Sequence, residues 1–149
     1  MAFTFKFSKV LALKEKEKDA AKSGYNEAVQ KFENAATELY LLLKQKEEFI
    51  EEKEQQIQKG IPIAKIQNAE RFLLSLEKSI NYWQGQVAKT RRSMEIKQQY
   101  LLEKNIEVKK YEKLKEKSWN SFSQFEKTEQ NKMMDEISIQ QYMNRGNQV

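Results

Sequence analysis

Several residue types that carry much of protein chemistry are missing or scarce in this chain. There is no cysteine and no histidine, and there are only two aspartates, one proline and four glycines. The absence of cysteine excludes disulfides and thiolate metal ligands, and the absence of histidine removes the commonest metal ligand and general base. No glycine-rich phosphate loop or catalytic triad can be drawn from these residues. We therefore expect no enzyme activity, no cofactor and no metal site.

Long apolar runs are also missing. No window approaches the roughly 18 to 20 apolar residues that a membrane span requires, and the first residues lack a small-residue cleavage site. We expect a cytoplasmic protein that meets a membrane only through its partners. Lysines and glutamates are finely interleaved around a net charge of +5, which is typical of solvated coiled-coil flanks and leaves little room for nucleic-acid binding.

What is present is an apolar residue at every seventh position from Ile66 to Phe122, with one break at Lys115. A second, partly polar column follows three residues behind the first. Two columns in seven form a narrow seam, which predicts one very long helix supercoiled against a single partner helix. The apolar members of the two columns are Ile66, Leu73, Ile80, Val87, Met94, Leu101, Val108 and Phe122, then Ala69, Leu76, Trp83, Tyr111 and Phe125.

The first half of the chain has its own seam, and Gly60-Ile61-Pro62 separates the two halves. Glycine suits a helix C-terminus and proline suits a helix start. The sequence therefore predicts an all-α fold, a long antiparallel two-helix coiled-coil hairpin whose second helix is longer than the first. We expect one domain over residues 1–149, with helices over about 5–59 and 63–145 and a turn at 60–62. The first seam contains Leu11, Tyr25, Phe32 and Leu39, with Ala21, Ala28, Ala35, Leu42 and Phe49.

The two seams can be tested against each other. If Ile61 is the midpoint of the turn, Phe49 meets Leu73 and Leu42 meets Ile80, so apolar positions face apolar positions. In the same register, Lys18 faces Lys104, and we expect this layer to be weak because the two ammonium groups repel each other. The hairpin register is therefore consistent along both helices, with three small-against-large layers formed by Ala21, Ala28 and Ala35 against Leu101, Met94 and Val87.

The second helix outruns its partner. In this register Phe5 lies level with Trp119, which leaves roughly 25 residues at 1.5 Å each without an internal partner from about residue 119 onward. A helix with unpartnered apolar groups is either frayed or folded against another molecule. The apolar residues of this overhang are Phe122, Phe125, Met133, Met134, Ile137, Ile139, Tyr142 and Met143.

Two aromatic groups are candidates for partner binding. Phe3, Phe5 and Phe7 alternate before the helical pattern begins; they form either a partner-binding edge or a cap on the coiled coil against Trp119 and Phe122. Tyr40 and Phe72 lie beside the seam near the turn. Because a two-helix rod buries little outside its seam, these two side chains favour a docking surface.

Three segments resemble the flagellar type III export protein FliJ family. They are FKFSKVLALKEKE (Phe5 to Glu17), ERFLLSLEKSI (Glu70 to Ile80) after the Gly-Ile-Pro turn, and MDEISIQQYMNR (Met134 to Arg145). The resemblance extends over the whole chain in length and layout. It implies a component of the flagellar export apparatus, with a coiled coil similar to the central stalk of rotary ATPases.

The resemblance also implies partners. Such a protein inserts the end that carries its termini into the hexameric export ATPase, works with the regulator of that ATPase, bridges it to the cytoplasmic domain of the export gate and handles empty export chaperones. The positions that match the family's gate-binding surface are Glu38, Leu42, Gln45, Phe49, Phe72, Leu76, Ser79 and Trp83. For the ATPase ring we expect contacts from Phe3, Phe5, Phe7, Phe122, Phe125 and Met133.

Other functions fit the same rod. A generic cytosolic coiled-coil adaptor and a stalk protein of a virulence type III secretion system are the nearest alternatives. A basic rod that binds nucleic acid is a third class, and it would show a steep dependence of its DNA affinity on salt.

Overall fold

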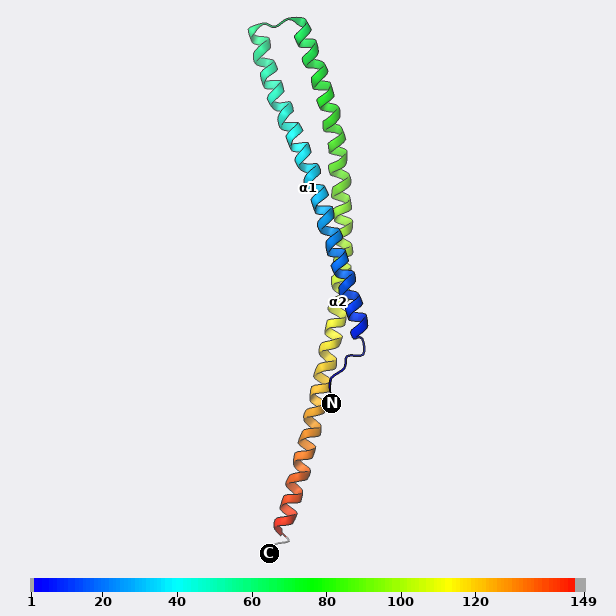
Figure 1. The fold of residues 1–149 in the computed structure, drawn as a ribbon. Helices are drawn as coiled ribbons and strands as arrows, with labels where there is room; N and C mark the ends of the chain where they lie inside the picture. The colour runs from blue at the N-terminus through cyan, green and yellow to red at the C-terminus, as the bar shows by residue number, and fades with distance from the viewer. Residues whose placement is uncertain (1, 147–149) are drawn as a thin grey trace. The chain divides into compact units, whose positions relative to one another are not determined.

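The computed structural model describes residues 2–146 and contains two long α-helices (Figure 1). Helix α1 covers Ser8–Lys59 with 52 residues, and α2 covers Ile63–Gly146 with 84 residues. Within residues 2–146 no strand occurs. The prediction of an all-α antiparallel hairpin with a longer second helix is confirmed. Residues 1 and 147–149 of the predicted domain lie outside the described residues.

Helix α1 begins at Ser8, three residues later than the sequence indicated. The amide of Ser8 donates to the carbonyl of Phe5 at 3.2 Å, and the amide of Leu11 donates to the carbonyl of Phe7 at 2.9 Å. The alternating phenylalanines lie before the helix, where the rings of Phe3 and Phe7 pack against Trp119 and Tyr111 of α2. Contacts with α2 continue inside the helix at Leu11.

The turn between the helices depends on Gly60. Its φ of +83° lies in the left-handed region that favours glycine, and its amide donates to the carbonyl of Ile57 at 3.1 Å. On the other side of the turn, the carbonyl of Pro62 accepts from the amides of Lys65 and Ile66 at 3.0 and 3.3 Å. Glycine thus ends α1 and proline precedes α2, in the order that the sequence indicated.

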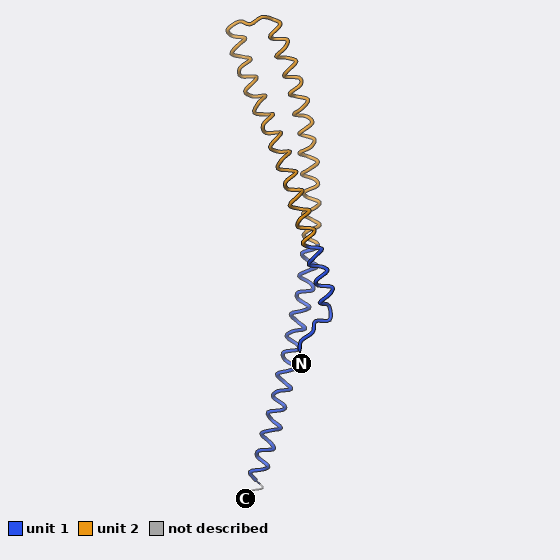
Figure 2. Tube along the Cα trace, in the orientation of Figure 1, with its two compact units in different colours: residues 1–18, 104–149 blue, residues 19–103 orange. Residues whose placement is uncertain are grey.

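The chain divides into two compact units (Figure 2). We call residues 19–103 the central unit and residues 1–18 with 104–149 the terminal unit. Each unit pairs a segment of α1 with a segment of α2. The expectation of one domain over the whole chain stays a prediction.

In the central unit, the seam is buried at the positions that the seven-residue pattern indicates. Leu76 and Ile80 are 6% and 5% exposed. The ring of Phe49 lies 4.7 Å from that of Phe72, within one residue of the predicted register. Ion pairs flank the seam between Lys46 and Glu77 at 3.6 Å and between Lys53 and Glu70. The small members of the seam are also buried, namely Ala21, Ala28 and Ala35.

In the terminal unit, a small core holds the start of the chain against α2. Phe5, Leu11 and Val108 are buried, and Val108 is only 1% exposed. Phe3 and Tyr111 are partly buried against this cluster. Because a two-helix seam buries few side chains, each of these residues carries a large share of the unit's apolar burial.

Leu11→Ala should lower the free energy of unfolding by about 2–4 kcal/mol, because it removes a buried side chain and leaves a cavity. Leu13 lies two residues away and is 55% exposed, so Leu13→Ala should change the same quantity by less than about 0.5 kcal/mol. Urea unfolding followed by circular dichroism measures both values. Equal effects of the two substitutions would argue against the packing described above.

Four charged side chains form a closed ring across the seam of the terminal unit. The ammonium of Lys14 lies 3.5 Å from Glu17 and 3.1 Å from Glu107, while that of Lys104 lies 3.2 Å from Glu17 and 3.5 Å from Glu107. The expectation that the layer of Lys18 and Lys104 is weak stays a prediction. Lys104 has two acidic partners, which the pairing of seam columns alone did not reveal.

This ring shifts two pKa values. Direct contact with the Lys14 ammonium holds the pKa of Glu107 below its ordinary value, with partial loss of water opposing the shift and the charge of Lys104 adding to it. The contact with Glu107 raises the pKa of Lys14, again against an opposing effect of burial, and Glu17 adds to the rise. The charged forms of both groups are thus favoured in the folded protein.

A carboxyl with a lowered folded-state pKa stabilises the protein above its ordinary value of about 4.5 and ceases to do so as the pH falls through the lower folded value. Glu107→Gln should therefore lower the melting temperature at pH 7 and have a progressively smaller effect below about pH 4.5. Melting curves between pH 7 and pH 3 measure the difference. Glu112→Gln, at an exposed position outside the ring, should lack this pH-dependent difference; the same profile for both variants would contradict the role of the ring.

The described residues contain neither a candidate membrane span nor a candidate metal site. None of their helices combines the length and the apolar character that crossing a membrane requires. Their histidine, cysteine, aspartate and glutamate side chains form no group of three or more that could hold a metal ion.

Candidate partner-binding surfaces

The first candidate surface lies in the central unit on both sides of the seam. Phe72 is 43% exposed and packs at 54° against Phe49 on the opposite helix, while Tyr40 is 63% exposed. Further along α2, the rings of Tyr82 and Trp83 meet edge to face at 5.4 Å. The half-buried rings of Phe49 and Trp83 position the exposed rings of Phe72 and Tyr82, because the seam holds the half-buried rings in place.

The predicted gate-binding positions fall into three groups by exposure. Leu76 is buried in the seam, so its side chain is available to a partner only at its edge. Intermediate exposure is found for the seam residues Leu42, Phe49 and Trp83 and for Ser79, and full exposure for Glu38, Gln45 and Phe72. Phe72 is thus the apolar member of the set with the most surface to offer. All eight positions belong to the central unit, and their contact with a gate protein stays a prediction.

Four further apolar residues near this surface were not among the predicted positions. They lie beside the seam columns and could have been found by searching for apolar residues outside those columns. We call them, together with Tyr40 and Phe72, the central patch, although at about 100° per residue its members point in different directions around the two helices. The four residues, with their exposed fractions, are Leu41 (52%), Leu43 (44%), Leu74 (58%) and Tyr82 (60%).

The second candidate region is an aromatic cluster in the terminal unit. The ring of Phe3 lies 5.2 Å from that of Trp119, edge to face, and 5.4 Å from that of Phe122. Phe7 lies 6.2 Å from Tyr111 and 5.9 Å from Phe5. Of the two alternatives for the opening phenylalanines, packing against Trp119 and Phe122 is therefore what the structure shows for Phe3. Phe5 is buried, whereas Phe7 remains 39% exposed.

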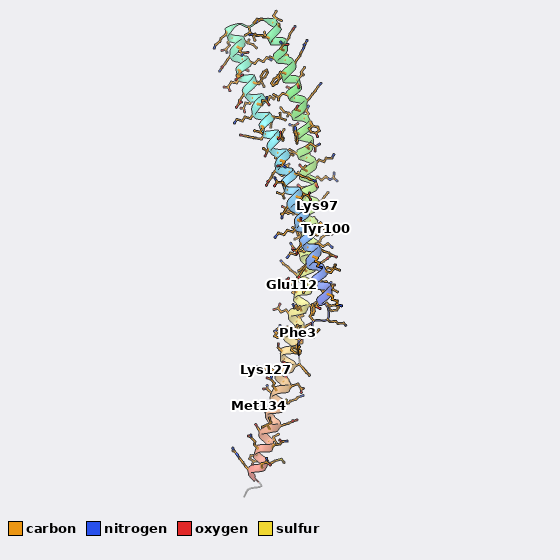
Figure 3. All side chains as sticks on the ribbon, in the orientation of Figure 1. Phe3, Lys97, Tyr100, Glu112, Lys127 and Met134 are labelled. Atoms are coloured by element: carbon orange, nitrogen blue, oxygen red, sulfur yellow. The ribbon has the colours of Figure 1, made fainter. Side chains whose placement is uncertain are left out.

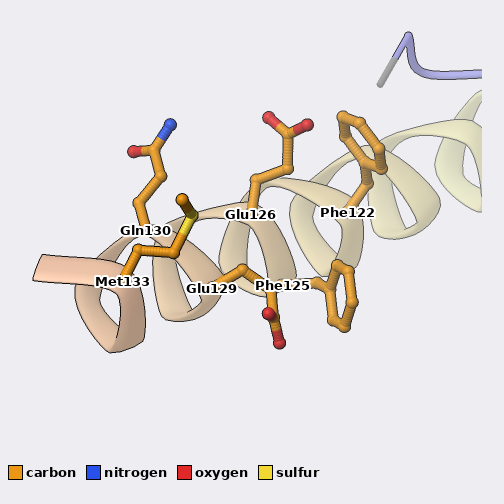
Figure 4. Close-up of a pocket in the computed structure, with 6 residues that line it drawn as sticks. All are labelled: Phe122, Phe125, Glu126, Glu129, Gln130 and Met133. Carbon is orange, nitrogen blue, oxygen red and sulfur yellow. The ribbon is translucent and has the colours of Figure 1, made fainter. Parts of the chain in front are cut away.

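Beyond this cluster, α2 continues with its apolar side chains exposed to solvent. Every residue from Lys127 to Gly146 is exposed, and Met134, 66% exposed, projects from this stretch (Figure 3). A hollow of about 310 Å³ follows successive turns of the helix (Figure 4). We call its apolar lining residues Phe122, Phe125 and Met133 the overhang patch; Glu126, Glu129 and Gln130 line it as well.

The members of the overhang patch differ in exposure. Phe125 and Met133 are 58% and 61% exposed, while Phe122 is partly covered by Phe3. Three of the six residues predicted to contact an ATPase ring thus line one hollow, whereas Phe3 and Phe5 serve intramolecular packing. Contact of these six residues with a ring stays a prediction.

Taken together, these surfaces are suited to contacts with other proteins. Large apolar side chains are exposed in both units, and the central patch and the overhang patch are among them. Exposed apolar side chains of this size are candidates for interaction sites. The fold defines a two-helix hairpin protein with apolar side chains exposed on both helices.

Comparison with known proteins identifies the family. The model of the family described as Flagellar FliJ protein matches residues 3–147. The Flagellar FliJ protein of Bacillus subtilis (strain 168) is 40% identical over 146 residues, covering 98% of this chain and 99% of the relative. The chain belongs to the flagellar FliJ protein family, and the resemblance of the three quoted segments is confirmed. No solved structure matches the chain.

Proposed function

We propose that this chain is a non-enzymatic stalk of the flagellar type III export apparatus. In this role it promotes assembly and activity of the hexameric export ATPase, works with the regulator of that ATPase, links it to the cytoplasmic domain of the export gate and handles export chaperones. Membership of a flagellar family supports a role in the flagellar apparatus. The fold of two long helices supports the role of a stalk within it. The chain then lies at the cytoplasmic face of the cell membrane through its partners.

The observation that carries the proposal is the presence of two separate apolar patches in two different units. A protein that bridges two partners needs two surfaces that can be occupied at once, and the central patch and the overhang patch share no residue. A coiled coil suits this task because its long helices, at about 1.5 Å per residue, offer many side chains to more than one partner.

For the gate we propose the central patch with the predicted positions around it, led by Phe72. Exposed aromatic side chains are the residues most often found to dominate binding at interfaces. Glu38 and Gln45 are exposed on α1 and offer polar groups for the rim of such an interface.

For the ATPase ring we propose the overhang patch together with Phe7. The unpartnered helix presents apolar groups along one hollow, and a single helix about 10–12 Å across, or a pair of them, is narrow enough for a ring pore.

The proposal is tested by adding the purified chain to a hexamer-forming flagellar export ATPase. We expect a larger fraction of assembled rings and a higher rate of ATP hydrolysis, together with capture of the gate's cytoplasmic domain by the same chain. An unchanged ATPase rate with no ring binding would contradict the proposal and favour a generic adaptor. Stimulation only of a virulence-system ATPase would favour the related stalk proteins.

A further inference from the structure

The charge of this chain is unevenly distributed. The central unit contains thirteen lysines and arginines and thirteen acidic residues, so its net charge is zero. By contrast, residues 1–18 and 104–118 of the terminal unit contain eleven lysines against five glutamates, a net charge of +6. The remaining residues 119–149 have a net charge of −1. The whole positive charge of the protein is thus concentrated in one short paired segment.

The five glutamates of this segment are not spread evenly among its lysines. Two of the five, Glu17 and Glu107, are held in the ring with Lys14 and Lys104. The other three, Glu15, Glu112 and Glu116, all line one hollow beside Trp119. Lysines are therefore the charged residues on the rest of the surface of this segment.

Those lysines lie on both outward sides of the paired helices. Lys9 and Lys16 are two residues before and five residues after the buried Leu11, which at about 100° per residue turns them away from α2. Lys110 and Lys113 have the corresponding spacing from the buried Val108, so they face away from α1. All are exposed. We call the outward lysines Lys9, Lys16, Lys109, Lys110, Lys113 and Lys117 the basic collar.

On α2 the collar includes a surface hollow. Lys109, Lys110 and Lys113 surround Ile106, which is 59% exposed, in a hollow of about 450 Å³. A partner that binds here can bury the exposed aliphatic side chain and also form favourable charge interactions with the surrounding ammonium groups.

We propose that the basic collar seats this chain inside a ring whose inner wall is acidic. The inference rests on the proposed function, because the ring in question is the export ATPase. What it adds is that electrostatic attraction between the basic collar and an acidic inner wall holds the stalk in the ring. Positive charge on both outward sides matches a partner that surrounds the helix pair. A flat anionic membrane would meet only one side, and duplex DNA would favour a continuous one-sided stripe.

The physical reason for a charged rather than an apolar seat is that charge attracts without demanding a single geometry. Long-range attraction between a basic rod and an acidic pore raises the rate of entry and centres the rod, while lysine heads remain hydrated and can exchange partners. Such a seat is sensitive to ionic strength, because exposed charges are screened over about 8–10 Å at physiological salt.

The test is to measure affinity of the full chain for the hexameric flagellar export ATPase at rising salt concentrations. The triple variant Lys109→Glu, Lys110→Glu, Lys113→Glu should bind at least about tenfold more weakly at low salt and lose most of the salt dependence, because like charges then face each other. A matched control is Lys44→Glu, Lys78→Glu, Lys89→Glu, which reverses three exposed lysines of the central unit. The control should bind as the unmodified chain does, and circular dichroism should show equal helicity for all three proteins.

The possible failures can be told apart. If the unmodified chain neither binds nor stimulates the ring, the proposed function fails and the collar inference fails with it. If the unmodified chain binds and the triple variant binds equally well with the same salt dependence, the inference alone is overturned. Loss of binding to duplex DNA or to anionic vesicles in the triple variant, with ring binding unchanged, would also overturn it in favour of that partner.

Discussion

Replacing Phe72 and Trp83 together by alanine is expected to abolish binding of the export gate's cytoplasmic domain and to leave stimulation of the export ATPase intact. Phe72 is exposed and packs against Phe49, while Trp83 is half-buried at the seam and packs against the exposed Tyr82. Loss of two aromatic anchors at about 2 kcal/mol each weakens binding roughly a thousandfold. Calorimetric titration with the isolated gate domain measures the loss, and an ATPase assay on the same samples measures the second activity.

The control for this pair is Ile80→Ala. Ile80 is 5% exposed, so its truncation should weaken the seam by about 2–4 kcal/mol without removing an exposed aromatic group. Trp83→Ala also removes some packing from the seam. Ile80→Ala shows how much gate binding is lost through weaker packing alone, and any further loss in the double variant comes from the docking surface. Equal reductions of gate binding and ATPase stimulation in the double variant would count against two separate sites.

The second large effect is expected in the terminal unit. Phe125→Ala with Met133→Ala should abolish stimulation of the export ATPase while gate binding persists, because these side chains are 58% and 61% exposed and have no internal packing role of comparable size. For the same reason, the free energy of unfolding should change by less than about 0.5 kcal/mol. ATP hydrolysis at increasing concentrations of the variant gives the result directly.

A matched pair of exposed apolar residues lies in the central unit. Ile96 and Leu102 are 60% and 50% exposed, so Ile96→Ala with Leu102→Ala removes similar apolar surface from another part of α2. This control should stimulate the ATPase normally. If it were as inactive as the overhang variant, general loss of exposed apolar area would explain the result and the overhang patch would have no special role.

Much of the fold could be predicted because its determinants are local and periodic. Residues such as Leu76 and Ile80 recur at seam positions whatever their partner. A run without proline, with only one glycine in the interior of each helix, continues as a helix. The turn could be placed because Gly60 and Pro62 each have a backbone preference that suits one side of a helix break. The hairpin register then follows within a residue from the position of that turn.

The surfaces were less predictable for a physical reason. Phe5 was expected to contact a partner, but the structure buries it with Leu11 and Val108. The opening residues have no helical period, so their conformation depends on which ring of α2 they reach. In the same way, the pairing of seam columns set Lys104 opposite Lys18 and did not reveal that its long flexible side chain reaches Glu17 and Glu107.

By itself, therefore, the sequence determined two helices of unequal length, the break between them and the residues that line their seam, because seven-residue periodicity and backbone preference act over short stretches of chain. Only the tertiary structure decided which opening phenylalanines pack inward, how Lys14, Glu17, Lys104 and Glu107 close into a ring, and which lysines are left on the outside. These features depend on distances between side chains far apart in the sequence, and those distances exist only once the two helices lie side by side.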